Sequence, residues 1–270
     1  PAPVQTHKGM NQRINLPLEG ELWKEVPLKD VKAGKLAVSK SGDIFFSQKQ
    51  TIYKLDFQGT LSEYAKIKGE AGSISFHRDG RLYVHDVRQH KIIVIGENGV
   101  ARDLVSNVED GFLTLSSKGI YFSEFSKDRI GFYNFSTREI QYDAVPFHPS
   151  GLAISAEQTF LNVGAANGVF GYSFKIEEDG GLDFGQEYIH YQKPYGSTGA
   201  GVSGMTIDAE NLLYSVTPMG IQVSDQLGRV NFIFSKPAEK ALDVKLGGVD
   251  FNTLYLSSNG KLYSRKINAK

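Results

Sequence analysis

The chain has 270 residues, and its 30 basic and 30 acidic residues give a formal net charge of zero. This balance offers no electrostatic basis for binding nucleic acid or an anionic membrane surface. No apolar run approaches the roughly 18 residues that a membrane span needs. The absence of cysteine excludes disulfides, thiol catalysis and zinc–thiolate sites. We therefore expect no nucleic-acid partner and no membrane span.

The N-terminal segment indicates a processed protein or a module of a larger polypeptide, because it begins Pro-Ala-Pro without an initiator methionine. A removed signal peptide would explain this start and would fit the lack of cysteine. These features favour an extracytoplasmic location, either periplasmic or secreted. Residues 1–18 are polar and are predicted to form an arm or linker. Residues 19–270 are predicted to form one domain.

From residue 33 onward the chain repeats one design: a small-residue start, a short apolar strand, a polar turn and a second apolar strand. The copies start at Ala33, Ala71, Asp110, Ser150 and Ser203, and a looser copy starts at Asp243. A large residue in each second strand marks the repeat: Phe45, Tyr83, Tyr121, Leu161, Tyr214 and Tyr255. A period of roughly 40 to 50 residues with several strands is typical of a propeller blade. Six copies predict six blades.

Further strands follow these pairs and predict four strands in each blade. Third strands are expected at 51–55, 91–95, 129–135, 169–174 and 221–224, and fourth strands at 62–67 and 231–235. The last copy has three strands, at 244–246, 253–257 and 261–266. We expect residues 22–26 to supply the missing strand and so remove an open sheet edge. The predicted fold is an all-β, six-bladed β-propeller of four-stranded blades, closed by an N-terminal strand.

A longer interval separates the fourth and fifth copies. Residues 193–201 are rich in Gly, Ser and Pro and are predicted to form a loop. This loop either covers one face of the ring or is an ordinary connection. Tyr195 in this loop is a candidate for stacking on a sugar or packing against a partner, although simple loop packing explains it equally well.

Several segments resemble one known family. Residues 149–155 are similar to the Pro-Asn-Gly-Leu-Ala-x-Ser motif of the gluconolactonase, senescence-marker-protein and luciferin-regenerating-enzyme family. Residues 178–182 resemble its acidic turn, and residues 202–214 resemble its Pro-Asp-Gly-Met-x-x-Asp-x-x-Gly-x-Leu-Tyr segment. The resemblance covers nearly the whole chain beyond Lys32. It implies a six-bladed propeller and, for many members, lactone hydrolysis.

The resemblance also implies a single divalent cation, usually calcium, at the channel mouth. In the family it is held by a Glu of blade one, an Asn of blade four and an Asp of blade five, and an Asn of blade three assists the substrate. These four positions fall on Ala33, Ser150, Ser203 and Asp110, and all of them depart from the pattern. Serine hydroxyls are poor calcium ligands beside carboxylates, so Asp110 is the remaining weak metal candidate. We expect no cofactor, or calcium or another divalent cation if the site has moved.

Other residues that could bind a ligand or catalyse a reaction lie at the expected strand starts. Asp110 and Asp243 form either a relocated metal or acid–base site or two solvated turn residues. A Ser–His–Asp system needs a histidine beside Ser150 or Ser203, and the spacing shows none. The catalytic candidates are Asp110, Ser150, Ser203 and His148. The ligand-binding candidates are Asp110, Asp243, Ser150, Ser203, His85 and Tyr195.

Two functions follow. The first is a divergent propeller that has lost the family's metal-ligand set and binds a small molecule or a protein at the channel face. The second is a hydrolase of a sugar lactone or related ester with a rearranged site at the channel mouth. We favour the first, because the Glu, Asn and Asp ligand positions are all substituted.

Overall fold

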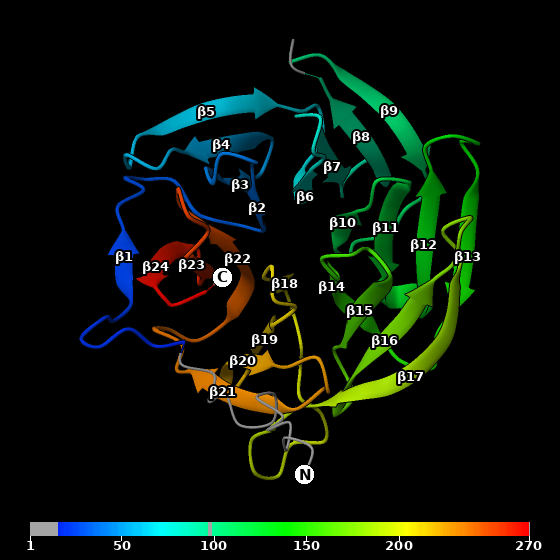
Figure 1. Cartoon of the computed structure of the whole chain (residues 1–270). Helices are drawn as coiled ribbons and strands as arrows, with labels where there is room; N and C mark the ends of the chain where they lie inside the picture. Colours follow the sequence, from blue (N-terminus) through cyan, green and yellow to red (C-terminus); the bar gives the residue numbers. More distant parts are fainter. Residues whose placement is uncertain (1–15, 97–98, 270) are drawn as a thin grey trace, which may run out of the picture.

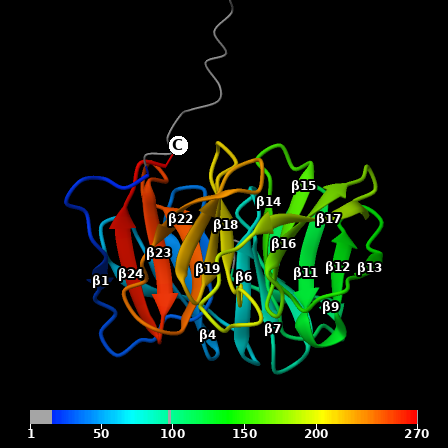
Figure 2. The ribbon, with the colours of Figure 1, turned by 90° about the horizontal axis from the view of Figure 1, so that it is seen from below.

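The computed structural model describes residues 16–96 and 99–269. Six four-stranded antiparallel sheets surround a central axis and form a six-bladed β-propeller (Figure 1). Seen from the side, the blades stand next to one another as a flat ring (Figure 2). Within the described residues, the helical content is one short 3₁₀ turn, η1 (Phe125–Lys127). No helix in this part of the chain has the length and hydropathy needed to cross a membrane.

Each blade begins with its innermost strand. Blade 1 contains β2 (Leu36–Val38), β3 (Ile44–Gln48), β4 (Thr51–Leu55) and β5 (Leu61–Lys66). Blade 2 contains β6 (Ala71–Phe76), β7 (Leu82–Asp86), β8 (Lys91–Ile95) and β9 (Ala101–Ser106). Blade 3 contains β10 (Leu113–Leu115), β11 (Gly119–Glu124), β12 (Arg129–Asn134) and β13 (Ile140–Ala144).

The second half of the ring follows the same plan. Blade 4 contains β14 (Pro149–Ile154), β15 (Phe160–Ala165), β16 (Phe170–Ile176) and β17 (Leu182–His190). Blade 5 contains β18 (Met205–Ile207), β19 (Leu213–Thr217), β20 (Gly220–Ser224) and β21 (Val230–Phe234). Blade 6 contains β22 (Ala241–Gly247), β23 (Thr253–Ser258), β24 (Lys261–Lys266) and the N-terminal β1 (Lys24–Val26).

The N-terminal strand closes the ring, and this prediction is confirmed. Strand β1 pairs antiparallel with β24, with Lys24 opposite Ser264 and Val26 opposite Leu262 (Figure 1). The edge of β24 is therefore covered, which prevents pairing with another chain. Of the predicted arm, residues 1–15 lie outside the described part. Leu16, which is part of that arm, is 2% exposed and packs in the core shared by blades 5 and 6.

The core lies between neighbouring blades. One buried cluster joins blades 1 and 2, another joins blades 3 and 4, and a third joins blades 5 and 6. The aromatic markers contribute to these contacts: Phe45 of blade 1 lies 4.5 Å from Phe76 of blade 2 between ring centroids. Buried apolar area stabilises such interfaces by roughly 25 cal/mol per Å². Apolar side chains on both faces of a blade therefore pack against the two neighbouring blades.

Strand direction decides which loops reach each end of the channel. The chain enters a blade at the inner strand, so the loops between blades share one face with the turns between second and third strands. The loop at 107–112 and the turn at 86–91 both lie on that face. At the opposite end, a hollow of about 250 Å³ is lined by the inner strands of all six blades, including Lys245.

Candidate functional site

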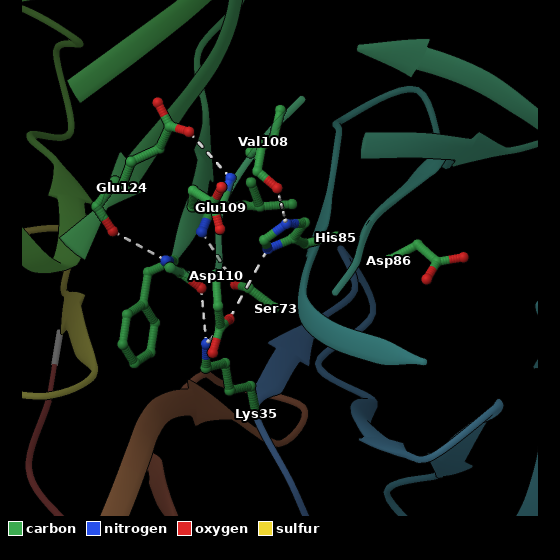
Figure 3. Close-up of polar contacts among 12 residues, drawn as sticks. Lys35, Ser73, His85, Asp86, Val108, Glu109, Asp110 and Glu124 are labelled. Atoms are coloured by element: carbon green, nitrogen blue, oxygen red, sulfur yellow. Dashed lines mark hydrogen bonds and ion pairs between the residues drawn. The ribbon is translucent and has the colours of Figure 1, made fainter. Parts of the chain in front are cut away.

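Asp110 is the exposed centre of a polar cluster on the inter-blade-loop face (Figure 3). It lies in the loop that enters blade 3, and 66% of its side chain is exposed. Its Oδ1 accepts a hydrogen bond from Lys35 Nζ at 3.0 Å. The following Gly111 packs so closely that an added Cβ would lie 1.8 Å from the Ser123 carbonyl oxygen. The loop can therefore approach β11 only with glycine at this position.

Lys35 reaches this carboxylate from blade 1, which is not a neighbour of blade 3 in the ring. Its side chain is only 12% exposed. Besides Asp110, its ammonium donates to the Gly111 carbonyl at 2.7 Å and lies 4.4 Å from the centroid of the Phe112 ring. The ion pair therefore passes the inner edge of blade 2. It holds the positive charge of Lys35 next to the Asp110 carboxylate. No local sequence pattern marks Lys35 as a partner of Asp110, because the two residues are 75 positions apart.

His85 lies beneath Asp110 on β7 and is 1% exposed. Its Nε2 lies 3.2 Å from the Val108 carbonyl oxygen, and its Nδ1 lies 3.9 Å from Asp110 Oδ1. Because a carbonyl only accepts hydrogen bonds, we assign the hydrogen to Nε2 and a lone pair to Nδ1. Burial lowers the pKa of His85 and outweighs the opposing effects of the Val108 hydrogen bond and Asp110. The imidazole is therefore neutral at pH 7.

Glu124 supports the loop that carries Asp110. This buried carboxylate accepts a hydrogen bond from the Glu109 backbone N–H at 2.9 Å (Figure 3). It also accepts hydrogen bonds from Arg129 Nε and from Lys127 Nζ at 3.2 Å. Burial acts to raise the pKa of Glu124, but these donors outweigh it and hold the pKa below its ordinary value. The loop is also held from blade 2, where Ser73 Oγ accepts a hydrogen bond from Leu113 N at 2.9 Å.

Neither candidate serine has a hydrogen bond from its hydroxyl to a histidine among the described residues. Ser150 is 7% exposed on β14, and its carbonyl accepts a hydrogen bond from Ser123 Oγ at 2.8 Å. Its own buried Oγ has no hydrogen-bond partner among the described residues. Ser203 Oγ donates to the Ala241 carbonyl at 3.5 Å. Among the described residues, neither hydroxyl forms a nucleophile–base pair.

Asp243 connects blade 6 to blade 1. It is 1% exposed, and its Oδ2 accepts a hydrogen bond from Leu36 N at 2.9 Å. Its Oδ1 accepts from Val244 N at 2.9 Å and from Lys245 Nζ at 3.0 Å. An added Cβ on Gly204 would lie 2.1 Å from the same Oδ1. A role in ligand binding stays a prediction, and in the protein itself this carboxylate holds two blades together.

The two remaining candidates lie outside the Asp110 cluster. His148 Nδ1 hydrogen-bonds to Asp128 Oδ1, and the ring lies 4.9 Å from that of Phe125. The His148 side chain is 41% exposed. Tyr195 is fully exposed in the connection between β17 and β18. Both side chains are accessible, and their roles in binding or catalysis stay predictions.

The charged groups around Asp110 determine which kind of ligand, a metal ion or a polar molecule, this cluster can bind. Among the residues that the structure describes, no group of three or more His, Asp or Glu side chains is placed to bind a metal ion. The cluster instead offers one exposed carboxylate, one bound ammonium and one neutral imidazole. Such groups can accept and donate hydrogen bonds to a polar ligand.

No protein-family model matches the chain, and no curated protein is similar to it in sequence. Solved structures are similar in fold. A gluconolactonase from Xanthomonas campestris superposes with a TM-score of 0.78 at 16% identity, over 93% of this chain and 91% of that one. A luciferin-regenerating enzyme gives 0.73 at 13% identity, over 93% and 97%. The calcium-binding protein regucalcin from Agrobacterium tumefaciens gives 0.71 at 12% identity, over 89% and 91%. The resemblance seen in the sequence is therefore confirmed for the fold, which is that of the gluconolactonase, luciferin-regenerating-enzyme and regucalcin structures.

Proposed function

We propose that this protein is a binding module that recognises a small molecule or a protein at the channel mouth around Asp110. The observation that carries the proposal is the ammonium of Lys35, held 3.0 Å from Asp110 Oδ1. Proteins with the same fold can have different functions, so the fold alone does not identify the chemistry and the residues around Asp110 have to.

The donor set does not fit a calcium ion. Hard divalent cations take six to eight oxygen ligands, several of them carboxylates. Of the four positions implied by the family resemblance, Ala33 has no ligand atom and the two serines supply neutral hydroxyls. Asp110 is already paired with Lys35, and a divalent cation at this carboxylate would be repelled by the ammonium. We therefore derive no catalytic step through a metal.

The proposed ligand is recognised by the exposed side of Asp110. Because 66% of this side chain remains exposed while it pairs with Lys35, the carboxylate can accept further hydrogen bonds. A ligand carrying hydroxyl, amide or ammonium donors matches this acceptor. The buried supports around it, Glu124 and Ser73, hold the loop in place before binding. Such preorganisation reduces the ordering cost of binding.

Two observations favour hydrolysis of a sugar lactone or related ester as the second candidate. The buried hydroxyl of Ser150 has no hydrogen-bond partner within residues 16–96 and 99–269, and His85 presents an Nδ1 lone pair towards Asp110. A hydrolase would use these groups to bind the ester and move a proton. Unpaired buried polar atoms are uncommon and often mark functional sites.

The experiment that separates the two candidates is turnover of simple aldonolactones by the wild type and by Asp110→Ala. The binding proposal predicts rates equal to the uncatalysed background for both. Asp103→Ala is the matched control. The Asp103 side chain is 65% exposed, and its Oδ2 lies 2.7 Å from Lys91 Nζ in an ion pair on the outer strands of blade 2. Turnover by the wild type and Asp103→Ala that is lost in Asp110→Ala would establish the hydrolase instead.

A further inference from the structure

Five of the six blades place an aromatic ring at the same position of their second strand. The register pairs this residue with the middle of the inner strand, as Phe45 pairs with Ala37 and Tyr214 with Thr206. The five rings are Phe45, Tyr83, Tyr121, Tyr214 and Tyr255. Several of them contact the next blade: Tyr121, for example, donates a hydrogen bond to the Gly180 carbonyl at 2.7 Å. The ring at this position therefore fills space between blades.

Blade 4 departs from this pattern. The sequence repeat marks Leu161, but the register places Asn162 opposite Ala153, at the position of the aromatic ring in the other blades. Asn162 is paired with Ser173 on β16, and Ser173 is paired with Gln186 on β17. An amide, a hydroxyl and a second amide thus form a row across three strands of blade 4.

This row faces a groove of about 360 Å³ between blades 4 and 5. Its lining includes Asn162, Ser173, Gln186, Tyr188, Ile207 and Leu213. Asn162 is 8% exposed and Ser173 is 6% exposed, so both side chains are largely buried where they line the groove. A largely buried amide therefore lines the groove at the position where the other five blades have a ring, and a largely buried hydroxyl lies beside it. Ligand sites start at a volume of about 300 Å³.

The charged residues in the lining of this groove are two carboxylates, Glu157 and Asp225, and they disfavour an anionic ligand. Glu157 Oε1 at the rim accepts a hydrogen bond from Asn211 Nδ2 at 2.8 Å. Asp225 is paired with Arg229 Nη2 at 2.9 Å. An apolar ring would leave the Asn162 amide and the Ser173 hydroxyl unpaired, which is costly when they are fully desolvated. The lining therefore favours a neutral ring that carries several hydrogen-bonding groups.

We propose that this groove is a binding site for a neutral pyranose sugar, either free or at the end of a glycan. The amides of Asn162 and Gln186 and the hydroxyl of Ser173 hydrogen-bond to sugar hydroxyls. Ile207, Leu213 and Tyr188 supply the apolar surface against which the C–H groups of the ring pack. The site lies apart from Asp110 and does not depend on the function proposed for the channel mouth.

The test uses methyl pyranosides of glucose, galactose and mannose, with binding followed by ligand-observed NMR and calorimetry on the full chain. At least one of them is expected to bind the wild type. Asn162→Tyr restores the ring of the other blades and is expected to abolish binding while the protein keeps its cooperative unfolding. Ser173→Ala is expected to weaken binding about fivefold through the loss of one hydrogen bond. Ser173→Ala also keeps the test decisive if Asn162→Tyr fails to fold.

Gln141→Ala is the matched control, because Gln141 holds the position of Gln186 on the outer strand of blade 3. It and Asp110→Ala are expected to bind the sugar as the wild type does, which separates this proposal from the function of the channel mouth. The proposal is overturned if none of the pyranosides binds up to about 10 mM. It is also overturned if Asn162→Tyr or Ser173→Ala binds the sugar as tightly as the wild type. Binding of phenol in the groove without any pyranoside would contradict the polar ligand class.

Discussion

Asp243→Ala is expected to destabilise the propeller strongly, although the sequence placed Asp243 among the ligand-binding candidates. The carboxylate accepts hydrogen bonds from Leu36 N, Val244 N and Lys245 Nζ at 2.9, 2.9 and 3.0 Å, and it is 1% exposed. Its removal leaves two buried backbone N–H groups and a largely buried ammonium without this acceptor. Breaking a buried pair in this way costs about 3–5 kcal/mol.

The assay is urea unfolding at pH 7, with Asp110→Ala and Asp243→Asn measured beside it. Asp110 is 66% exposed, so its ion pair with Lys35 contributes at most about 1 kcal/mol to the free energy of unfolding. Asp243→Asn keeps one acceptor oxygen and is expected to lie between the two alanine variants. A loss below about 1 kcal/mol in Asp243→Ala, or equal losses at both aspartates, would refute the assignment of Asp243 to the contact between blades.

Three further predictions concern the ring closure, a buried carboxylate and one interblade hydrogen bond. Deleting residues 1–27 removes β1 and exposes the edge of β24, so light scattering should show dimers or larger species, and a stable monomer would contradict the closure. The pKa of Glu124 is lower in the folded state than in the unfolded chain. The ionised carboxylate therefore contributes fully to the free energy of unfolding above the unfolded pKa of about 4.3, and this contribution is lost as the pH falls through the folded-state pKa. The stability difference between wild type and Glu124→Gln should therefore be constant near neutral pH and shrink below about pH 4.3, and a difference independent of pH would contradict the assigned shift. Tyr121→Phe removes the hydrogen bond to the Gly180 carbonyl and should cost about 1 kcal/mol in urea unfolding, whereas no loss would mean that this bond is not made in solution.

Much of the fold could be predicted because the strand pattern is local. The expected strands at 51–55 and 91–95 have the bounds of β4 and β8. The missing strand of the last blade was also predictable, since three strands there required a fourth and residues 22–26 alternate. Local signals could not place Asn162, because Leu161 and Asn162 are adjacent and only the register with β14 decides which one faces the groove.

The candidate site was harder to predict because its contacts are distant in sequence. Asp110 was identified from its place at a strand start, but its partner Lys35 lies 75 residues earlier and meets it only when the ring is formed. Asp243 occupies the equivalent start of blade 6, yet the structure brings it against Leu36 N, 207 residues away. The sequence shows that both are acidic residues at strand starts. It does not show which of them turns towards solvent.

Calcium-dependent thermal stability, measured with metal content on the same purified sample, tests the central claim most directly. A ligand at a hundredfold excess over its dissociation constant stabilises a protein by about 2.7 kcal/mol. Because Lys35 occupies the carboxylate of Asp110, we predict no bound metal and the same melting temperature in calcium and in chelator. A calcium-dependent rise that chelation reverses, and that Asp110→Ala abolishes, would contradict the account and make a metal-dependent hydrolase the better interpretation.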